Sequence, residues 1–301
     1  MSRSINVVEK TKGPVVPINI CFNGDATVDF GAIRDYASTL SANGVPVILL
    51  TSGSSEYAWL SEKDVWGITE VIAEAINGRS LFIAASGSWD VNTTASYLKH
   101  ADAVGADAVK VQPHLLLSSE RDIYFGYFDR IREGSDIPLF LLDPPLALAI
   151  EMASDEQIVG AKVHSLPDYY SLTRATRDQN FAAICAGQMG NMVFGHQIGS
   201  PAYLCPIAPF LPRIALEFFE KLEERRYDDA LKFVSQYEVP WMETAIEIGW
   251  LHAVKEAIRL VGFYPNNRLA PPQRSTTPEQ AKRVRDVLER VFGQDLVKCS
   301  D

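Results

Sequence analysis

The run Val45-Pro46-Val47-Ile48-Leu49-Leu50-Thr51 sets the pattern that the rest of this chain repeats. Asn43-Gly44 precedes the run and Ser52-Gly53 follows it, so a short and almost wholly apolar segment is bounded by residues that favour turns. A strand that is apolar on both faces is typical of a parallel sheet that is covered on both sides. The run therefore predicts a buried parallel strand.

Similar runs recur along the first two hundred residues, and helical patterns alternate with them. Between runs, apolar residues recur at helical spacing, as Ile33, Tyr36, Ala37 and Leu40 do. Alternating strands and helices imply parallel β-α-β units, and eight such units favour a closed (β/α)8 TIM barrel over a doubly wound open sheet. No G-x-G-x-x-G follows the first run, which argues further against a dinucleotide-binding sheet. The expected strands are residues 15–20, 45–51, 81–85, 107–111, 138–142, 159–163, 181–186 and a weaker last one around 199–204.

Beyond residue 209 the pattern is helical only, and it predicts helices over residues 212–225, 227–236, 241–261 and 278–292. The last one opens on Thr277-Pro278-Glu279-Gln280, a capping box with proline at the first helical position. We therefore expect an N-terminal tail (1–12), the barrel strands with most of the helices (13–209), and the last barrel helix with a C-terminal helical extension (210–301).

Composition excludes several classes of partner. Lys and Arg number 28 against 38 Asp and Glu, a net charge of −10, which disfavours binding to nucleic acid or to an anionic membrane surface. No apolar stretch is long enough for a membrane helix, and the N-terminus lacks the apolar core of a signal peptide. The four scattered cysteines form no C-x-x-C pair, so we expect neither disulfides nor a zinc site, and a cytoplasmic protein.

Two lysines stand out because each lies in an apolar strand. Lys162 shares a strand face with Gly160, whose lack of a side chain leaves room beside it. Burial lowers the pKa of a lysine, and its neutral amine then attacks carbonyl groups. The alternative is that Lys162 reaches solvent or pairs with a buried carboxylate. Lys110 has the same character, and for it a structural ion pair is the favoured interpretation.

The loops after the strands carry the active site of a parallel barrel. The loop from Thr51 to Ser55 supplies hydroxyls and free N–H groups that can hold a carboxylate, unless it is only an ordinary polar loop. His164 and His114 are candidates for proton transfer near neutral pH, although a lone histidine is more often simply hydrogen-bonded. No metal-ligand spacing, phosphate-binding loop or nucleophile elbow is present, so no metal and no cofactor is expected.

Taken in order, these motifs identify a resemblance to the dihydrodipicolinate synthase / N-acetylneuraminate lyase family, class I aldolase-type barrels with a helical C-terminal extension. The resemblance covers about residues 13–292 and implies that Lys162 is the Schiff-base lysine, that the substrate is a 2-oxo acid, and that the protein is a homodimer or homotetramer. The segments that carry it are Gly13-Pro14-Val15-Val16-Pro17, Ser52 to Glu56 with Leu60-Ser61, Gly105-Ala106-Asp107-Ala108-Val109, Ile137-Pro138, Val159-Gly160-Ala161-Lys162, Val254-Lys255-Glu256-Ala257 and Arg268-Leu269-Ala270-Pro271-Pro272.

The chain departs from this family at the hydroxyl groups of its proton relay. Where the family has Y-N-x-P after the fifth strand, this chain has Leu142-Asp143-Pro144-Pro145, so Leu142 stands at the tyrosine position. The two threonines of G-T-T-G-E fall on Gly53 and Ser54, and the second tyrosine of P-P-Y-Y falls on Leu115. The resemblance therefore implies that another group moves the protons; His164 is expected first, ahead of His114 and Asp143.

The expected function is a lyase, an aldolase or a dehydratase, acting on a 2-oxo acid such as pyruvate or a sugar-acid derivative through a Lys162 Schiff base. A genuine dihydrodipicolinate synthase is not expected. The alternative is a member without catalysis that binds a 2-oxo acid as a regulatory protein. The expected catalytic residues are Lys162 and His164, and the expected substrate contacts are Gly53, Ser54, Ser55, His114, Leu142, Asp143 and Gly187.

Overall fold

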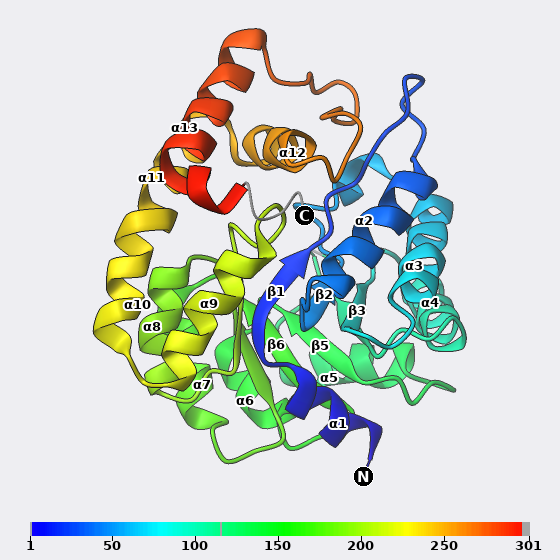
Figure 1. The fold of residues 1–301 in the computed structure, drawn as a ribbon. Helices are drawn as coiled ribbons and strands as arrows, with labels where there is room; N and C mark the ends of the chain where they lie inside the picture. The colour runs from blue at the N-terminus through cyan, green and yellow to red at the C-terminus, as the bar shows by residue number, and fades with distance from the viewer. Residues whose placement is uncertain (1, 115, 297–301) are drawn as a thin grey trace.

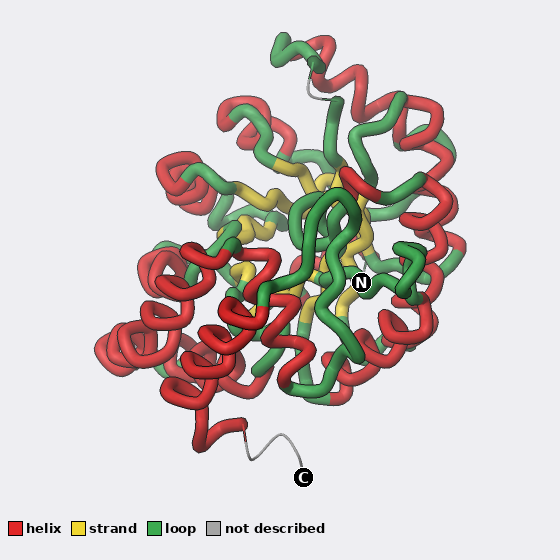
Figure 2. Tube along the Cα trace, turned by 90° about the horizontal axis from the view of Figure 1, so that it is seen from above, coloured by secondary structure: helices red, strands yellow, loops and turns green. Residues whose placement is uncertain are grey.

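A closed barrel of eight parallel strands forms the centre of the computed structural model, which describes residues 2–114 and 116–296. The strands pair in sequence order and β8 closes the ring against β1 (Figure 1). Seen from above, the strands occupy the middle and helices surround them (Figure 2). The predicted (β/α)8 barrel is confirmed. The strands are β1 (Gly13–Pro17), β2 (Val47–Leu49), β3 (Leu81–Ala85), β4 (Ala108–Val111), β5 (Leu139–Leu142), β6 (Ile158–Val163), β7 (Ala182–Cys185) and β8 (Ala202–Leu204).

One helix follows each strand, and the remaining ones lie at the two ends of the chain. The barrel helices are α2 (Phe30–Ala42), α3 (Glu62–Ile76), α4 (Val91–Ala103), α5 (Arg121–Ile131), α6 (Leu146–Met152), α7 (Leu166–Ala175), α8 (Met189–Gln197) and α9 (Pro212–Glu223). The others are α1 (Arg3–Lys10), α10 (Tyr227–Phe233), α11 (Val239–Ile248), α12 (Trp250–Leu260) and α13 (Pro278–Leu296).

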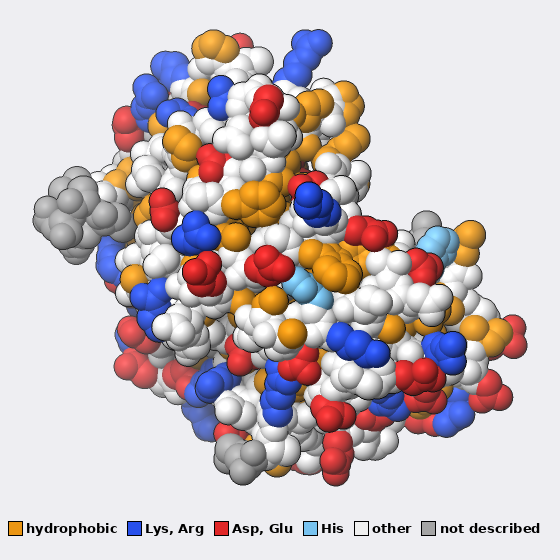
Figure 3. Space-filling view, turned by 90° about the vertical axis from the view of Figure 1, so that its right-hand side faces the viewer, with side chains coloured by type: hydrophobic (Ala, Val, Ile, Leu, Met, Phe, Trp, Pro, Cys, Tyr) orange, Lys and Arg blue, Asp and Glu red, His pale blue; other side chains and the backbone are white. Residues whose placement is uncertain are grey.

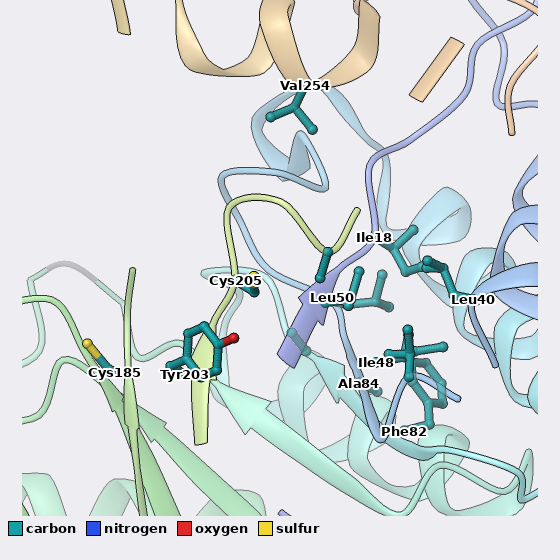
Figure 4. Packing of buried hydrophobic residues seen from close by; sticks show 14 of the residues in the cluster. Ile18, Leu40, Ile48, Leu50, Phe82, Ala84, Cys185, Tyr203, Cys205 and Val254 are labelled. Atoms are coloured by element: carbon teal, nitrogen blue, oxygen red, sulfur yellow. The ribbon is translucent and has the colours of Figure 1, made fainter. Parts of the chain in front are cut away.

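Two apolar layers hold the barrel together. Side chains that point inward, such as Val47, Ile83 and Phe140, form one cluster, which fills the barrel interior. A larger cluster lies between the strands and the helices, and Figure 4 shows members of it, among them Leu40 and Ile48. The strands are buried on both sides, as the apolar runs predict.

Helix α1 occupies the segment expected as an N-terminal tail. Its Val7 is 3% exposed and belongs to the interior cluster, so α1 covers the end of the barrel at which the strands begin (Figure 1). The hydroxyl of Ser2 caps the helix by accepting a hydrogen bond from the N–H of Ile5.

Two helix predictions require correction. The helix expected over residues 241–261 is two helices, because Gly249 takes a φ of 106° between α11 and α12. Helix α8 was not predicted, since Gly190 and Gly195 lower helix propensity there. Gly195 is required by packing, because a Cβ at this position would lie 2.1 Å from the hydroxyl of Tyr169.

The surface carries acidic and basic side chains interspersed on the face shown in Figure 3. Among the described helices, none has the length and apolarity needed to cross a membrane.

Candidate active site

A cavity of about 570 Å³ opens at the end of the barrel where the strands finish. Its wall begins with Pro17 at the end of β1 and the loop after β2, and it includes the ends of β6, β7 and β8. Side chains from α11 and α12 complete it, and these helices lie beyond this end of the barrel (Figure 1). The lining residues are Pro17, Thr51, Ser52, Gly53, Ser54, Lys162, His164, Ala186, Gly187, Gln188, Leu204, Cys205, Pro206, Met242, Trp250 and Leu251.

Lys162 reaches this cavity from the inward face of β6. The face is set by Gly160, where a Cβ would lie 2.4 Å from the ring of Phe140 and from the carbonyl oxygen of Ala182. Two residues further along the strand, Lys162 points the same way and is 4% exposed. Burial lowers the pKa of Lys162 to about 8, and the negative charge of Asp143 opposes the shift only in part. A substantial fraction of this amine is therefore neutral near pH 7 to 8.

His164 lies between Lys162 and Asp143. Its Nε2 is 3.2 Å from Lys162 Nζ, and its Nδ1 is 2.6 Å from Asp143 Oδ2. The backbone N–H of His164 also donates to Asp143 Oδ1 at 2.7 Å. With Nδ1–H donating to the carboxylate, Nε2 is left to accept a proton from the lysine amine. An amine, an imidazole and a carboxylate thus form a connected chain, and a nucleophile, its base and a group that orients the base can be arranged in this order.

Asp143 takes this position through an unusual backbone conformation. It follows β5 with a φ of 42°, and its N–H donates to the carbonyl of Lys162 at 3.0 Å. Burial alone would raise the pKa of Asp143, but the hydrogen bonds from His164 outweigh burial and hold it below its usual value. The carboxylate therefore stays ionised and fixes the imidazole. The carboxylate that binds the ring of His164 is thus that of Asp143.

Lys110 lies deeper in the barrel, on the same face of β4 as the interior residue Ala108. It is 1% exposed, and its Nζ has no hydrogen-bond partner among the described residues. Burial, with the charge of Lys162 adding to it, lowers the pKa of Lys110 to about 7, and Asp143 opposes this. The prediction that Lys110 forms an ion pair is wrong, because no carboxylate of the described chain comes within salt-bridge distance of its amine.

The loop after β2 divides into a part that faces the cavity and a part that holds the loop in place. Gly53 and Ser54 line the cavity. Ser55 does not, because its hydroxyl donates to the carbonyl of Ile18 at 2.6 Å. Glu56 is fully buried and pairs with Lys255 of α12 at 2.6 Å, so the loop is tied to the C-terminal helices.

Of the other expected substrate contacts, Gly187 lines the cavity, and Asp143 is outside the set of lining residues. Leu142 is half-buried at the end of β5, in register with Lys162, outside the set of lining residues. His114 lies on the exposed loop after β4, where its Nδ1 accepts from the N–H of Leu116 at 3.2 Å, and it does not line the cavity. Leu115 lies outside the described residues.

Sequence reasoning missed the wall formed by Met242, Trp250 and Leu251. Helical periodicity marks these residues as apolar, but it does not say where the C-terminal helices pack. Cys205 also lines the cavity; burial raises the pKa of its thiol to about 12, so it is protonated at neutral pH and a poor nucleophile. In the part of the chain that the structure describes, no group of three His, Cys, Asp or Glu side chains is placed to hold a metal ion.

Comparisons with known proteins agree with this architecture. The model of the dihydrodipicolinate synthetase family matches residues 10–291. A DapA-like lyase of Thermococcus onnurineus, itself uncharacterized, is 23% identical over 299 residues, which cover 93% of this chain and 99% of the relative. A probable 5-dehydro-4-deoxyglucarate dehydratase of Streptomyces avermitilis is 26% identical, over 92% of this chain and 85% of that protein. The structure of the E. coli K12 prophage protein YagE in complex with pyruvate superposes with a TM-score of 0.83 at 18% identity, over 93% of this chain and 98% of YagE.

Proposed function

Because the chain belongs to the dihydrodipicolinate synthetase family, a family of lyases, we propose that it cleaves or dehydrates a 2-oxo acid through a Schiff base on Lys162. The observation that carries the proposal is the line of groups from Lys162 through His164 to Asp143 at the wall of the cavity. Pyruvate, the molecule bound to YagE in its structure, is the simplest substrate with the required carbonyl.

The Schiff base forms through a carbinolamine, and His164 transfers protons both when the carbinolamine forms and when it loses water. The neutral amine of Lys162 attacks C2 of the 2-oxo acid, and the proton that it loses passes to Nε2 of His164, 3.2 Å away. The imidazolium returns this proton to the alkoxide oxygen, which gives the neutral carbinolamine. A second proton, taken up from solvent by the same imidazole, then converts the hydroxyl into water, and its departure leaves the protonated imine. Asp143 holds the ring and stabilises its positive charge while the proton is on it. General acid–base catalysis of this kind is worth about 10²–10⁴-fold in rate.

The protonated imine then accepts the electron pair of the bond that breaks. In an aldolase this bond joins C3 to C4, and a base removes the proton of the C4 hydroxyl as an aldehyde leaves. In a dehydratase a proton is lost from C3 and a hydroxyl leaves with a proton as water. His164 is the group placed to accept or donate these protons, directly or through one water.

We place the substrate carboxylate against Gly53 and Ser54, which line the cavity on the side of β2. The hydroxyl of Ser54 and backbone N–H groups of this loop are hydrogen-bond donors suited to a carboxylate. The buried pair of Glu56 and Lys255 keeps the loop in position before substrate arrives.

We further propose that the protein is not a genuine dihydrodipicolinate synthase. The resemblance puts the family's relay tyrosine at Leu142, whose side chain has no hydroxyl. This position is next to Lys162 in the strand register, and a leucine side chain there has no proton to donate to the imine. The acid–base role accordingly passes to His164, which directly follows the strand that carries the lysine.

The test is reduction with borohydride in the presence of pyruvate, followed by intact-mass spectrometry. We expect one stable pyruvate adduct per chain in the wild type and none in Lys162→Met. Lys63→Met, which changes an exposed lysine on α3, is the matched control and should give the wild-type adduct. No adduct with pyruvate or with any other 2-oxo acid would favour the regulatory binding protein instead.

A further inference from the structure

We propose that the site takes a 2-oxo acid whose far end is apolar, an aryl or branched alkyl group, rather than a sugar acid or a second carboxylate. The inference rests on the proposed imine at Lys162 and adds the chemical class of the rest of the substrate. It follows from how polar and apolar groups are divided over the wall of the cavity.

The side chains that carry hydroxyl groups lie on one side of the cavity. Thr51, Ser52 and Ser54 follow β2, and they supply the hydroxyl groups that the wall offers. A carboxylate at C1 of the substrate, held here, places the 2-oxo group toward Lys162. This end of the substrate uses the hydroxyl groups of the wall, while the amide of Gln188, after β7, also lines the cavity.

The wall contributed by β8 and the C-terminal helices is apolar. Leu204 ends β8, Met242 lies on α11, and Trp250 with Leu251 begins α12. The two leucines have no hydrogen-bonding group, methionine has only a weak acceptor, and tryptophan has a single donor. A chain of hydroxyls packed here would leave polar groups unpaired, whereas an apolar group would replace water at a favourable free energy.

Charge supports the same conclusion. Among the described lining residues the ionisable side chains are Lys162, His164 and Cys205, and no arginine, aspartate or glutamate lines the cavity. The positive charge of the protonated imine lies next to the C1 carboxylate, the imidazole is bound to Asp143, and the thiol is protonated. A second carboxylate would therefore enter the cavity without a free cation to pair with, which is unfavourable.

The two sides of the cavity are fixed relative to each other. Glu56, directly after the polar loop, pairs with Lys255, which is one helical turn beyond Leu251 on α12. The cavity of about 570 Å³ falls in the range of small-molecule sites and is larger than pyruvate alone requires. The apolar wall is thus preformed at the place where the substituent beyond C3 would lie.

The experiment compares 2-oxo acids of matched shape by the concentration that gives half-maximal borohydride trapping on Lys162. The pair is 5-methyl-2-oxohexanoate and 2-oxoglutarate, which carry an isopropyl and a carboxylate group at the same position; 2-oxo-4-phenylbutanoate and 2-dehydro-3-deoxygluconate form a second pair. We expect the apolar member of each pair to reach half-maximal trapping at a concentration at least ~10-fold lower. Equal or tighter trapping of the polar members overturns the inference.

Variants locate the effect on the proposed wall. Met242→Gln and Leu251→Asn should each reduce the preference for the apolar members by at least ~5-fold, because a polar group then faces the substituent. Ile246→Gln is the control, since Ile246 lies on the same helix as Met242 but is 65% exposed. An unchanged preference in both wall variants overturns the placement of the substituent. Trapping with pyruvate distinguishes a failure of this inference from a failure of the proposed function. If pyruvate forms an adduct but the apolar 2-oxo acids are not preferred, this inference alone is refuted. If pyruvate and the other 2-oxo acids form no adduct, the proposed function is refuted together with it.

Discussion

Lys110→Met should make the protein more stable, and by an amount that falls as the pH rises. The amine is 1% exposed and unpaired within the described chain, so folding has to remove its proton or bury its charge. Its pKa is about 7 in the folded protein, against an ordinary lysine value of 10.5. Between these values the unfolded chain binds one more proton than the folded chain, so stability increases with pH across this window.

The size of the effect follows from the width of that window. About pH 7.5 lies about three units below the unfolded value, and each unit corresponds to about 1.4 kcal/mol, so Lys110 costs about 4 kcal/mol there. At about pH 9.5 the same arithmetic leaves about 1.4 kcal/mol. Methionine is similar in length and apolar, so the variant removes the penalty without opening a large cavity.

The assay is urea unfolding followed by circular dichroism, at a fixed protein concentration and at several pH values between these limits. We expect the wild type and Lys110→Met to converge as the pH rises. Lys63→Met, on the exposed surface of α3, should follow the wild type at every pH. A gain in stability that does not depend on pH, or a loss at neutral pH, would refute the assignment of Lys110 as a buried amine that is neutral in the folded protein.

Three further substitutions test other parts of the account. His164→Gln should lower kcat by ~10² or more, measured with any substrate identified by trapping, while borohydride still captures the imine; a kcat within a few-fold of wild type would make His164 structural. Glu56→Gln should destabilise the protein by about 3–5 kcal/mol in urea unfolding, because it leaves Lys255 buried without its partner, and an unchanged midpoint would contradict this. Gly160→Ala should cost about 1–3 kcal/mol, since a Cβ would meet atoms of both neighbouring strands at 2.4 Å; Gly126→Ala, in open space on α5, serves as its control and should not lower stability.

The barrel could be predicted because each of its strands carries its own signal. A run such as residues 45–51 is apolar enough to need cover on both faces, and that requirement is local to the sequence. Helix α8 carried no such signal, because it contains two glycines, and the contact of Gly195 with Tyr169 is visible only in the folded chain. The break at Gly249 was missed for a related reason: one glycine inside an apolar periodicity is compatible with a continuous helix.

The site divides in the same way. Lys162 could be found because a charged residue in an apolar strand is conspicuous, and His164 because strand residues two apart share a face. The hydrogen-bond partner of His164 could not be identified from sequence. Asp143 follows the neighbouring strand β5, and it reaches the imidazole only because its backbone takes a positive φ. Sequence predicts that Ser55 contacts the substrate, and only the structure shows that its hydroxyl donates a hydrogen bond to the carbonyl of Ile18 instead. Met242 and Trp250 depend on how a separate group of helices packs over the barrel, which no local pattern specifies.

The most direct test of the central claim is to locate the trapped imine by peptide mass spectrometry after reduction with pyruvate present. The barrel interior holds two lysines with a lowered pKa, Lys110 and Lys162, and Lys162 is the one that lines the cavity beside His164. The account predicts an adduct on Lys162 and an unmodified Lys110. An adduct on Lys110, or an adduct that persists at full yield in Lys162→Met, would contradict it.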